Sequence, residues 1–207
     1  QGDWTNNSGA AAFVGGTGKV NFNSSTSAQV IGGSATTDFY NIEISNSSGS
    51  PVSLSSNATV NNDLTFTDGS LDLSTNTLTV NGDLLNNASA SALDNSSGTI
   101  SLEGSATQTI GGLNETSFYN LTVNNSSANG VDLARNISVE NTLSFTDGHV
   151  NTTSSYQVTL NSSTGNLSGE TSSSYVKGTL TITKNVGSGS STFGNIGVSI
   201  PAGSSNL

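Results

Sequence analysis

The feature that most constrains this chain is a repeat of 79–80 residues, which is present twice in a sequence of 207. Three motifs return at an offset of 79: the Ile-Gly-Gly of residues 31–33 at 110–112, the Phe-Tyr-Asn of 39–41 at 118–120, and the Phe-Thr-Asp-Gly of 66–69 at 145–148. Nearer the N-terminus the offset is 80, and a third copy begins at residues 178–180 before it diverges. Internal periods of this kind are typical of solenoids, in which one structural unit is stacked on itself.

A shorter period divides each copy. The apolar residues that mark it are 22 apart in the first copy and 21 and 22 apart in the second: Phe22, Ile44 and Phe66, then Leu102, Val123 and Phe145. Each ends a triplet of alternating apolar and polar residues, and alternation places the two apolar side chains on the same face of a strand. Because 80 residues separate Phe22 from Leu102, we expect four turns of about 20 residues in each copy, and nine or ten turns in all.

These periods predict an all-β chain that folds as a right-handed parallel β-helix (β-solenoid) with coils of about 20–22 residues, two 79–80-residue repeats and a partial third. The solenoid is expected over residues 1–171, with copy one at about 2–81 and copy two at about 82–160. Residues 172–207 are expected to be a variant C-terminal segment or the start of a next module. The asparagines at strand ends are expected to stack at the bends: Asn41, Asn62, Asn120 and Asn141. The long period also permits two tandem β-sandwiches, which the 22-residue period disfavours.

Composition excludes several classes of function. The net charge is −10 and only four residues are Lys or Arg, so the chain lacks the basic cluster that nucleic-acid binding needs, and an anionic membrane surface would repel it. No run of about 18 apolar residues is present, so we expect no membrane insertion. There are no cysteines, which removes disulfides, structural zinc and thiol catalysis. The sequence opens directly into repeat-like residues, as a mature secreted chain would after cleavage of a signal peptide.

The acidic turns are the only candidates for an ion site. Asp68 and Asp147 occupy equivalent Asp-Gly turns, where Asp favours the turn and Gly supplies a positive φ. Together with Asp72 they are weak candidates for calcium, which binds carboxylate and carbonyl oxygens, although no established calcium-loop motif is present. As a catalytic pair the two turn acids would lie about four coils, or roughly 19 Å, apart, and a glycoside-hydrolysing pair needs about 5–9 Å. We therefore expect no enzyme and no cofactor.

The remaining conspicuous residues have structural explanations. His149 is the only histidine, and it matches Ser70 in copy one, which favours a turn residue over a catalytic one. Trp4 is the only tryptophan and matches Leu84, which predicts a core residue that closes the first coil.

An ice-binding face would need threonine at nearly every outward step. The outward residues of the successive triplets form a mixed set that includes a glutamate: Asn21, Glu43, Thr65, Ser101, Thr122, Ser144 and Thr181.

The order of these motifs is similar to that of a known family. The Gly-Asp-Trp-Thr-Asn-Asn-Ser-Gly of residues 2–9, the Gly-Lys-Val-Asn-Phe of 18–22, the Ala-Gln-Val-Ile-Gly-Gly of 28–33 and the Phe-Tyr-Asn-Ile-Glu-Ile of 39–44 follow one another. This order resembles the repeats of large secreted Bacteroidetes surface proteins, including gliding-type and biofilm adhesins exported by the type IX system. The segment 174–180 looks like the part that follows such repeats. No sorting domain is present, so we expect an N-terminal piece of a longer protein, or the ordered part of one.

The resemblance implies a non-catalytic adhesin or structural stalk module of a larger secreted protein, located at the cell surface or outside the cell. Two alternatives remain open. One is a subunit of an extracellular filament, because solenoids expose unpaired strand edges at their ends. The other is a carbohydrate-binding solenoid. The expected partners are accordingly cell-surface or extracellular, with polysaccharide and self-association both among them.

Overall fold

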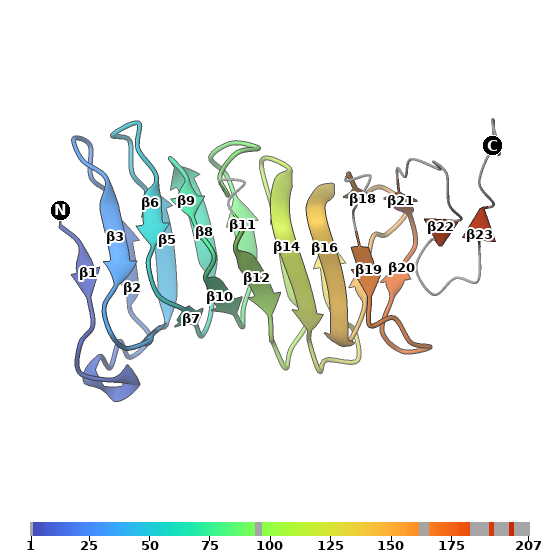
Figure 1. Cartoon of the computed structure of the whole chain (residues 1–207), viewed down its shortest axis with the longest axis horizontal. Helices are drawn as coiled ribbons and strands as arrows, with labels where there is room; N and C mark the ends of the chain where they lie inside the picture. Colours follow the sequence, from blue (N-terminus) through green and yellow to red (C-terminus); the bar gives the residue numbers. More distant parts are fainter. Residues whose placement is uncertain (1, 94–96, 162–165, 183–190, 193–198, 201–207) are drawn as a thin grey trace.

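The computed structural model is a β-solenoid built from parallel strands, and it describes residues 2–93, 97–161, 166–182, 191–192 and 199–200. Successive strands follow one another along the long axis of the molecule, from β1 near the N-terminus to β21 (Figure 1). Between β1 and β21 every strand pairing in the described residues is parallel, which confirms the predicted solenoid and excludes the tandem sandwiches, whose sheets are antiparallel.

The strands form three sheets, which we call sides A, B and C. Side A contains β1 (Trp4–Thr5), β3 (Gln29–Gly32), β6 (Val52–Leu54) and β9 (Leu71–Asp72). Side B contains β2 (Lys19–Phe22), β5 (Asn41–Ser45), β8 (Leu64–Asp68), β11 (Leu84–Asn86), β13 (Gln108–Gly112), β15 (Val131–Leu133), β17 (Val150–Asn151) and β20 (Val176–Lys177). Side C contains β4 (Thr37–Phe39), β7 (Ala58–Val60), β10 (Thr77–Val80), β12 (Thr99–Leu102), β14 (Thr116–Asn124), β16 (Ile137–Asp147), β18 (Val158–Leu160), β19 (Asn166–Ser168) and β21 (Leu180–Ile182).

Two strands of side C are long enough to turn a corner of the solenoid. The second half of β14 pairs with β12, and the second half of β16 pairs with β19. Their first halves pair with each other, the first half of β16 also pairs with β18, and β18 pairs with β21. These segments share the hydrogen-bonded sheet of side C but lie on the other side of the corner. A short 3-10 segment, η1 (Ala10–Ala12), takes the place of a strand in the first coil, and an antiparallel pair, β22 (Ser191–Thr192) with β23 (Ser199–Ile200), belongs to none of the three sheets.

The core is a continuous set of stacked apolar side chains. Along the strands, buried and partly exposed residues alternate, as the two-residue period of a strand requires. Phe22 is in register with Ile44, and Ile44 with Phe66, so the 22-residue period does mark neighbouring coils. Each such side chain contributes about 1.5–3 kcal/mol when it is fully buried.

Polar side chains inside the corners are hydrogen-bonded in the same way in both copies. Asn46 donates to Gln29 Oε1 at 3.1 Å, and Asn125 donates to Gln108 Oε1 at 2.8 Å. The same glutamine oxygens accept the backbone N–H of Ser24 and Gly104. Buried amides are tolerated only when such partners exist, so these pairs fix the geometry of the long turns.

The predicted asparagine stacking is confirmed. Asn62 donates to Asn41 Oδ1 at 2.8 Å, and Asn141 donates to Asn120 Oδ1 at 2.8 Å. Both pairs join the bends of neighbouring coils. They therefore hold the register of the stack outside the apolar core.

The two copies are rotated by one side, and the predicted four turns per copy are wrong for this reason. The pair β1–β3 lies on side A, whereas its equivalent in copy two, β11–β13, lies on side B. Likewise β2–β5 lies on side B and its equivalent, β12 with the second half of β14, on side C. Ten strands, β1 to β10, and the η1 segment occupy eleven sides per copy, one short of the twelve that four turns would need.

The described residues make fewer turns than predicted, and the stack extends further along the sequence than the predicted boundary. Side B has eight strands separated by seven steps, so the described residues make seven to eight turns instead of nine or ten. Coil lengths range from 19 residues between Val131 and Val150 to 27 between Trp4 and Ile31. Strands β20 and β21 pair with β17 and β18, so the stack continues past the boundary expected at residue 171.

Aromatic side chains cover the first coil. The ring of Trp4 lies 4.6 Å from that of Phe13 and 5.0 Å from that of Phe39, measured between centroids. Its Nε1 donates to Thr37 Oγ1 at 3.1 Å. Trp4 therefore closes this end of the core, as its match to a leucine in copy two predicts.

Candidate functional site

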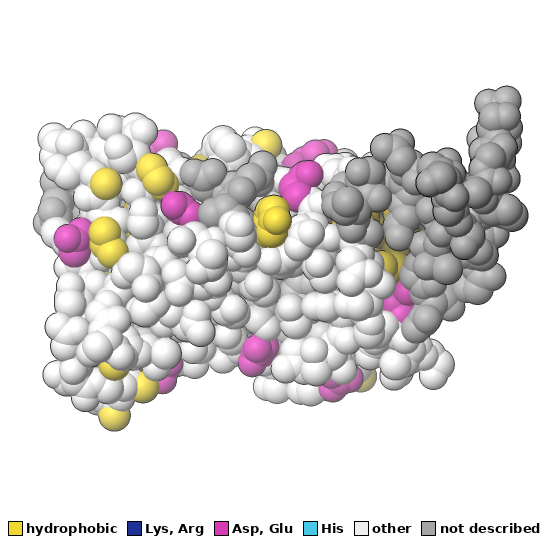
Figure 2. Space-filling view, in the orientation of Figure 1, with side chains coloured by type: hydrophobic (Ala, Val, Ile, Leu, Met, Phe, Trp, Pro, Cys, Tyr) yellow, Lys and Arg dark blue, Asp and Glu magenta, His cyan; other side chains and the backbone are white. Residues whose placement is uncertain are grey.

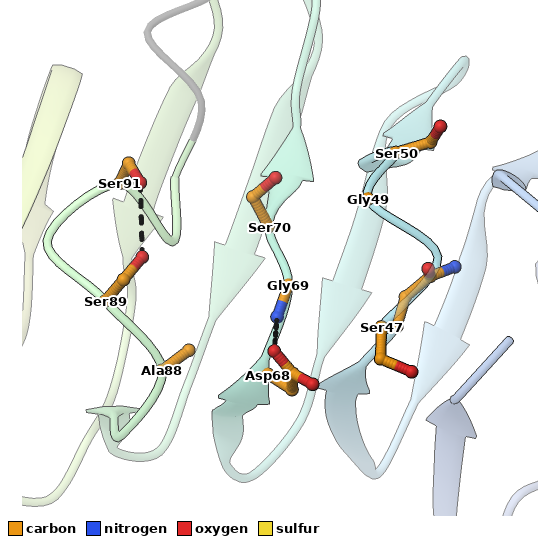
Figure 3. Close-up of a pocket in the computed structure, with 10 residues that line it drawn as sticks. Ser47, Gly49, Ser50, Asp68, Gly69, Ser70, Ala88, Ser89 and Ser91 are labelled. Atoms are coloured by element: carbon orange, nitrogen blue, oxygen red, sulfur yellow. Dashed lines mark hydrogen bonds between the residues drawn. The ribbon is translucent and has the colours of Figure 1, made fainter. Parts of the chain in front are cut away.

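Two matched hollows lie where the loops of three consecutive coils meet. The first has a volume of about 340 Å³ and is bounded by the loops at residues 46–50, 68–70 and 88–91. Figure 3 shows these loops side by side, with Asp68, Ser70 and Ser89 among the residues drawn. The second has a volume of about 370 Å³ and is bounded by residues 126–128, 147–149 and 172–175. At the offset of 79, two of the three loops correspond, so the repeat builds the same concave feature twice.

The Asp-Gly turns are the fixed part of each hollow. Gly69 has a φ of 73° and Gly148 a φ of 78°, a region that glycine adopts without cost. A Cβ at either position would collide with a carbonyl oxygen of the preceding coil, that of Asn46 or of Asn125. The carboxylates of Asp68 and Asp147 each accept the N–H of the following glycine at 2.8 Å. These acids therefore form the turn, as the structural interpretation of the sequence predicted.

The structure does not bring the calcium candidates together. Asp68 and Asp147 belong to different hollows. Asp72 lies in β9 on side A, where its Oδ1 accepts the N–H of Ser74 at 2.7 Å. Among the residues that the structure describes, no group of three or more His, Asp or Glu side chains is placed to hold a metal ion. Calcium binding at these turns stays a prediction.

The second hollow differs from the first by two rings. His149 stands where copy one has Ser70, and its imidazole is nearly parallel to the ring of Tyr175, at 23° and a centroid distance of 6.1 Å. Tyr175 is 37 % exposed. Tyr175 could not be identified from the sequence, because it follows a run of serines outside the matched part of the repeat. Only the pairing of β20 with β17 shows that it meets His149.

The outward residues of sides B and C correct the mixed column expected from the sequence. Asn21, Glu43 and Thr65 are aligned on side B. Ser101, Thr122 and Ser144 are aligned on side C instead, so the glutamate is not part of their column. That column contains one acid at its N-terminal end and hydroxyl residues at every later step: Asp38, Thr59, Thr79, Ser101, Thr122, Ser144 and Ser168. Thr122 and Ser144 are hydrogen-bonded at 3.0 Å, a cross-strand contact that stabilises the sheet.

One ion pair lies on side B. Lys19 donates to Glu43 Oε2, and Thr67 donates to Glu43 Oε1 at 3.0 Å. The hydrogen bond from Lys19 is the main reason that the pKa of Glu43 lies below its usual value, and partial burial opposes this effect. Side-chain exposure is 53 % for Lys19 and 16 % for Glu43, so this is a surface pair rather than a buried charge.

The remaining surface is mainly uncharged and polar. Figure 2 shows scattered acidic and apolar side chains on one face, with none of the basic or histidine colours in view. Large apolar residues that are exposed in the described part of the chain lie far apart in the sequence: Val14, Leu113 and Tyr175. Within that part, no helix is long and apolar enough to cross a membrane.

Comparison with known proteins adds no assignment: no family model, curated protein or solved structure matches this chain.

Proposed function

We propose that the chain is a non-catalytic module of an extracellular surface protein, in which it serves as a stalk or adhesin. The observation that supports the proposal is the single apolar core, which includes residues of every coil from β2 to β19. Because each coil is hydrogen-bonded to its neighbours in parallel ladders, the module is a rod whose length depends on the number of coils. The extracellular setting rests on the resemblance of the repeats to secreted surface proteins.

The stalk role is tested by surface display. The chain would be placed between a membrane anchor and a peptide tag on a bacterial cell, and the height of the tag above the membrane measured by fluorescence. A Gly/Ser linker of equal length is the control, because it behaves as a flexible coil. We expect a narrow distribution of heights for the rod and increased attachment of the displaying cells to surfaces. A distribution as broad as that of the linker, with unchanged attachment, would overturn the proposal.

A filament subunit is the second candidate, and the sheet edges favour it. Strands β1, β2 and β4 are the terminal members of sides A, B and C, and edge strands present unpaired N–H and C=O groups that another chain can pair with. The Trp4 cluster covers the apolar core at this end. Sedimentation at increasing concentration tests the idea. Growth of long assemblies would support it, and a constant monomer mass would count against it.

A further inference from the structure

The second hollow combines a cavity, an exposed tyrosine ring, a partly exposed imidazole and several polar side chains. Its volume of about 370 Å³ is within the range of small-molecule sites. The rim carries the rings of His149 and Tyr175, and the walls carry serines from two loops, at residues 126–127 and 172–173. The first hollow is its natural control, since it has a similar volume and serine content but Ser70 in place of the imidazole and no ring from the third loop.

The rings in this hollow are placed to contact a ligand. A buried pair of rings would be explained by packing, but Tyr175 keeps 37 % of its surface exposed and His149 is also only partly buried. Tyrosine offers a rigid amphipathic surface, and serine and glycine beside it offer adaptable hydrogen bonds, a combination that recurs in recognition surfaces. One ring stacked on a neighbour is also held in place before a ligand arrives, which lowers the entropy cost of binding.

The polar groups of the hollow select a neutral ligand with several hydroxyls. Asp147 uses Oδ1 to accept the N–H of Gly148, which leaves Oδ2 to accept from a ligand hydroxyl. No Lys or Arg lines the hollow, so an anion would meet a carboxylate without a compensating positive charge. A flat apolar ligand would leave the serine hydroxyls and the carboxylate unpaired. A pyranose ring has an apolar face of C–H groups, which can lie on the tyrosine ring. It also has a rim of hydroxyls, which can hydrogen-bond to the serines and the carboxylate.

We propose that the hollow formed by Asp147, His149 and Tyr175 binds a neutral sugar unit, with its apolar face on the Tyr175 ring and a hydroxyl donating to Asp147. A stalk requires no ligand, whereas an adhesin does, so this site rests on the adhesin part of the proposed function. A failure to bind sugar would leave the stalk role standing. The first hollow is expected not to bind, because it has the turn carboxylate but no ring.

The single histidine provides a direct measurement. The chain has one imidazole, so its Hε1 proton gives one resolved signal in the proton NMR spectrum. Glucose, galactose, mannose and N-acetylglucosamine, each also as its short oligomer, would be titrated into the intact chain. We expect a saturable shift of this signal with at least one neutral sugar, and a much smaller shift with glucuronate, which Asp147 repels.

Matched variants locate the site. Tyr175→Ala is expected to weaken binding at least tenfold, whereas Tyr119→Ala, on β14 outside both hollows, is expected to leave it unchanged. Ser70→His places an imidazole in the first hollow without a partner ring, and it should add no second binding event in calorimetry. Circular dichroism of each variant confirms the fold. Absence of a saturable shift with every sugar, or equal binding by the Tyr175→Ala variant, would overturn the proposal.

Discussion

Copy one and copy two have the same motifs at fixed offsets, yet equivalent strands lie on different sides of the solenoid. Phe66 and Phe145 are equivalent in sequence, but Phe66 is on side B and Phe145 on side C. A copy of eleven sides on a three-sided solenoid ends one side early, so the next copy starts rotated by a third of a turn. The sequence period of this repeat therefore does not correspond to a whole number of turns of the solenoid.

The two copies also differ in what covers the core at the start of each copy. Trp4 and Phe13 in copy one correspond to Leu84 and Leu93 in copy two. Leu93 is bridged to Leu71 of the preceding coil, whereas Phe13 packs against Trp4 and Phe39. The larger rings of copy one therefore cover core surface that a neighbouring coil covers in copy two.

The largest predicted effect tests whether the rotated copies are energetically equivalent. Phe66→Ala and Phe145→Ala each remove a ring that is 0 % and 4 % exposed, respectively, and each is expected to lower the free energy of unfolding by about 3–5 kcal/mol. Urea denaturation followed by circular dichroism measures both. If one substitution costs less than about 1 kcal/mol and the other the full amount, the two sides are not equivalent parts of one core.

The second prediction concerns the turn glycines that both copies share. Gly69→Ala and Gly148→Ala place a side chain at a positive φ and against a carbonyl oxygen of the preceding coil. Each is expected to cost at least about 1–3 kcal/mol, measured in the same denaturation experiment. Gly49→Ala, at a φ of 81° with open space around the new Cβ, is the control, and it should cost less than either. An equal cost at Gly49 would show that the collision contributes nothing.

The third prediction sharpens the difference between the ends of the copies. Thr37 Oγ1 accepts a hydrogen bond from Trp4, but Thr116, its equivalent, has a buried Oγ1 for which the described residues offer no partner. Thr37→Val should therefore destabilise the chain by about 1–2 kcal/mol, because it leaves the indole N–H unpaired, and Thr116→Val should stabilise it by about 1 kcal/mol. Melting temperatures of the two variants should move in opposite directions. A shift of the same sign in both would refute the explanation.

The sequence predicted the strands, the apolar core and the asparagine pairs because each depends on local alternation and short-range matching. It could not predict the rotation, because residue offsets fix which residues correspond but not how many sides lie between them. Coils of 19 to 27 residues have loops of different lengths, and only the pairing of strands shows where those loops start. The ring pair at the second hollow was missed for the same reason: Tyr175 reaches His149 through the pairing of β20 with β17, outside any matched motif.

The smallest predicted effect concerns a charge pair that copy two replaces with hydroxyl residues. Lys19 and Glu43 correspond to Thr99 and Thr122, so the double substitution Lys19→Thr and Glu43→Thr converts this part of side B to the copy-two sequence. The folded pKa of Glu43 is lowered, chiefly by the hydrogen bond from Lys19. The pair therefore stabilises the fold above the unfolded pKa, near 4.5, and the contribution is lost as the pH falls through the folded value. For a surface pair it is expected to be at most about 1 kcal/mol. Urea denaturation at pH 7 should show the wild type as the more stable chain by this amount, and the difference should shrink at pH 3 and at high salt. A difference that does not change with pH would mean that the contacts of the side chains, and not their charges, stabilise this part of side B.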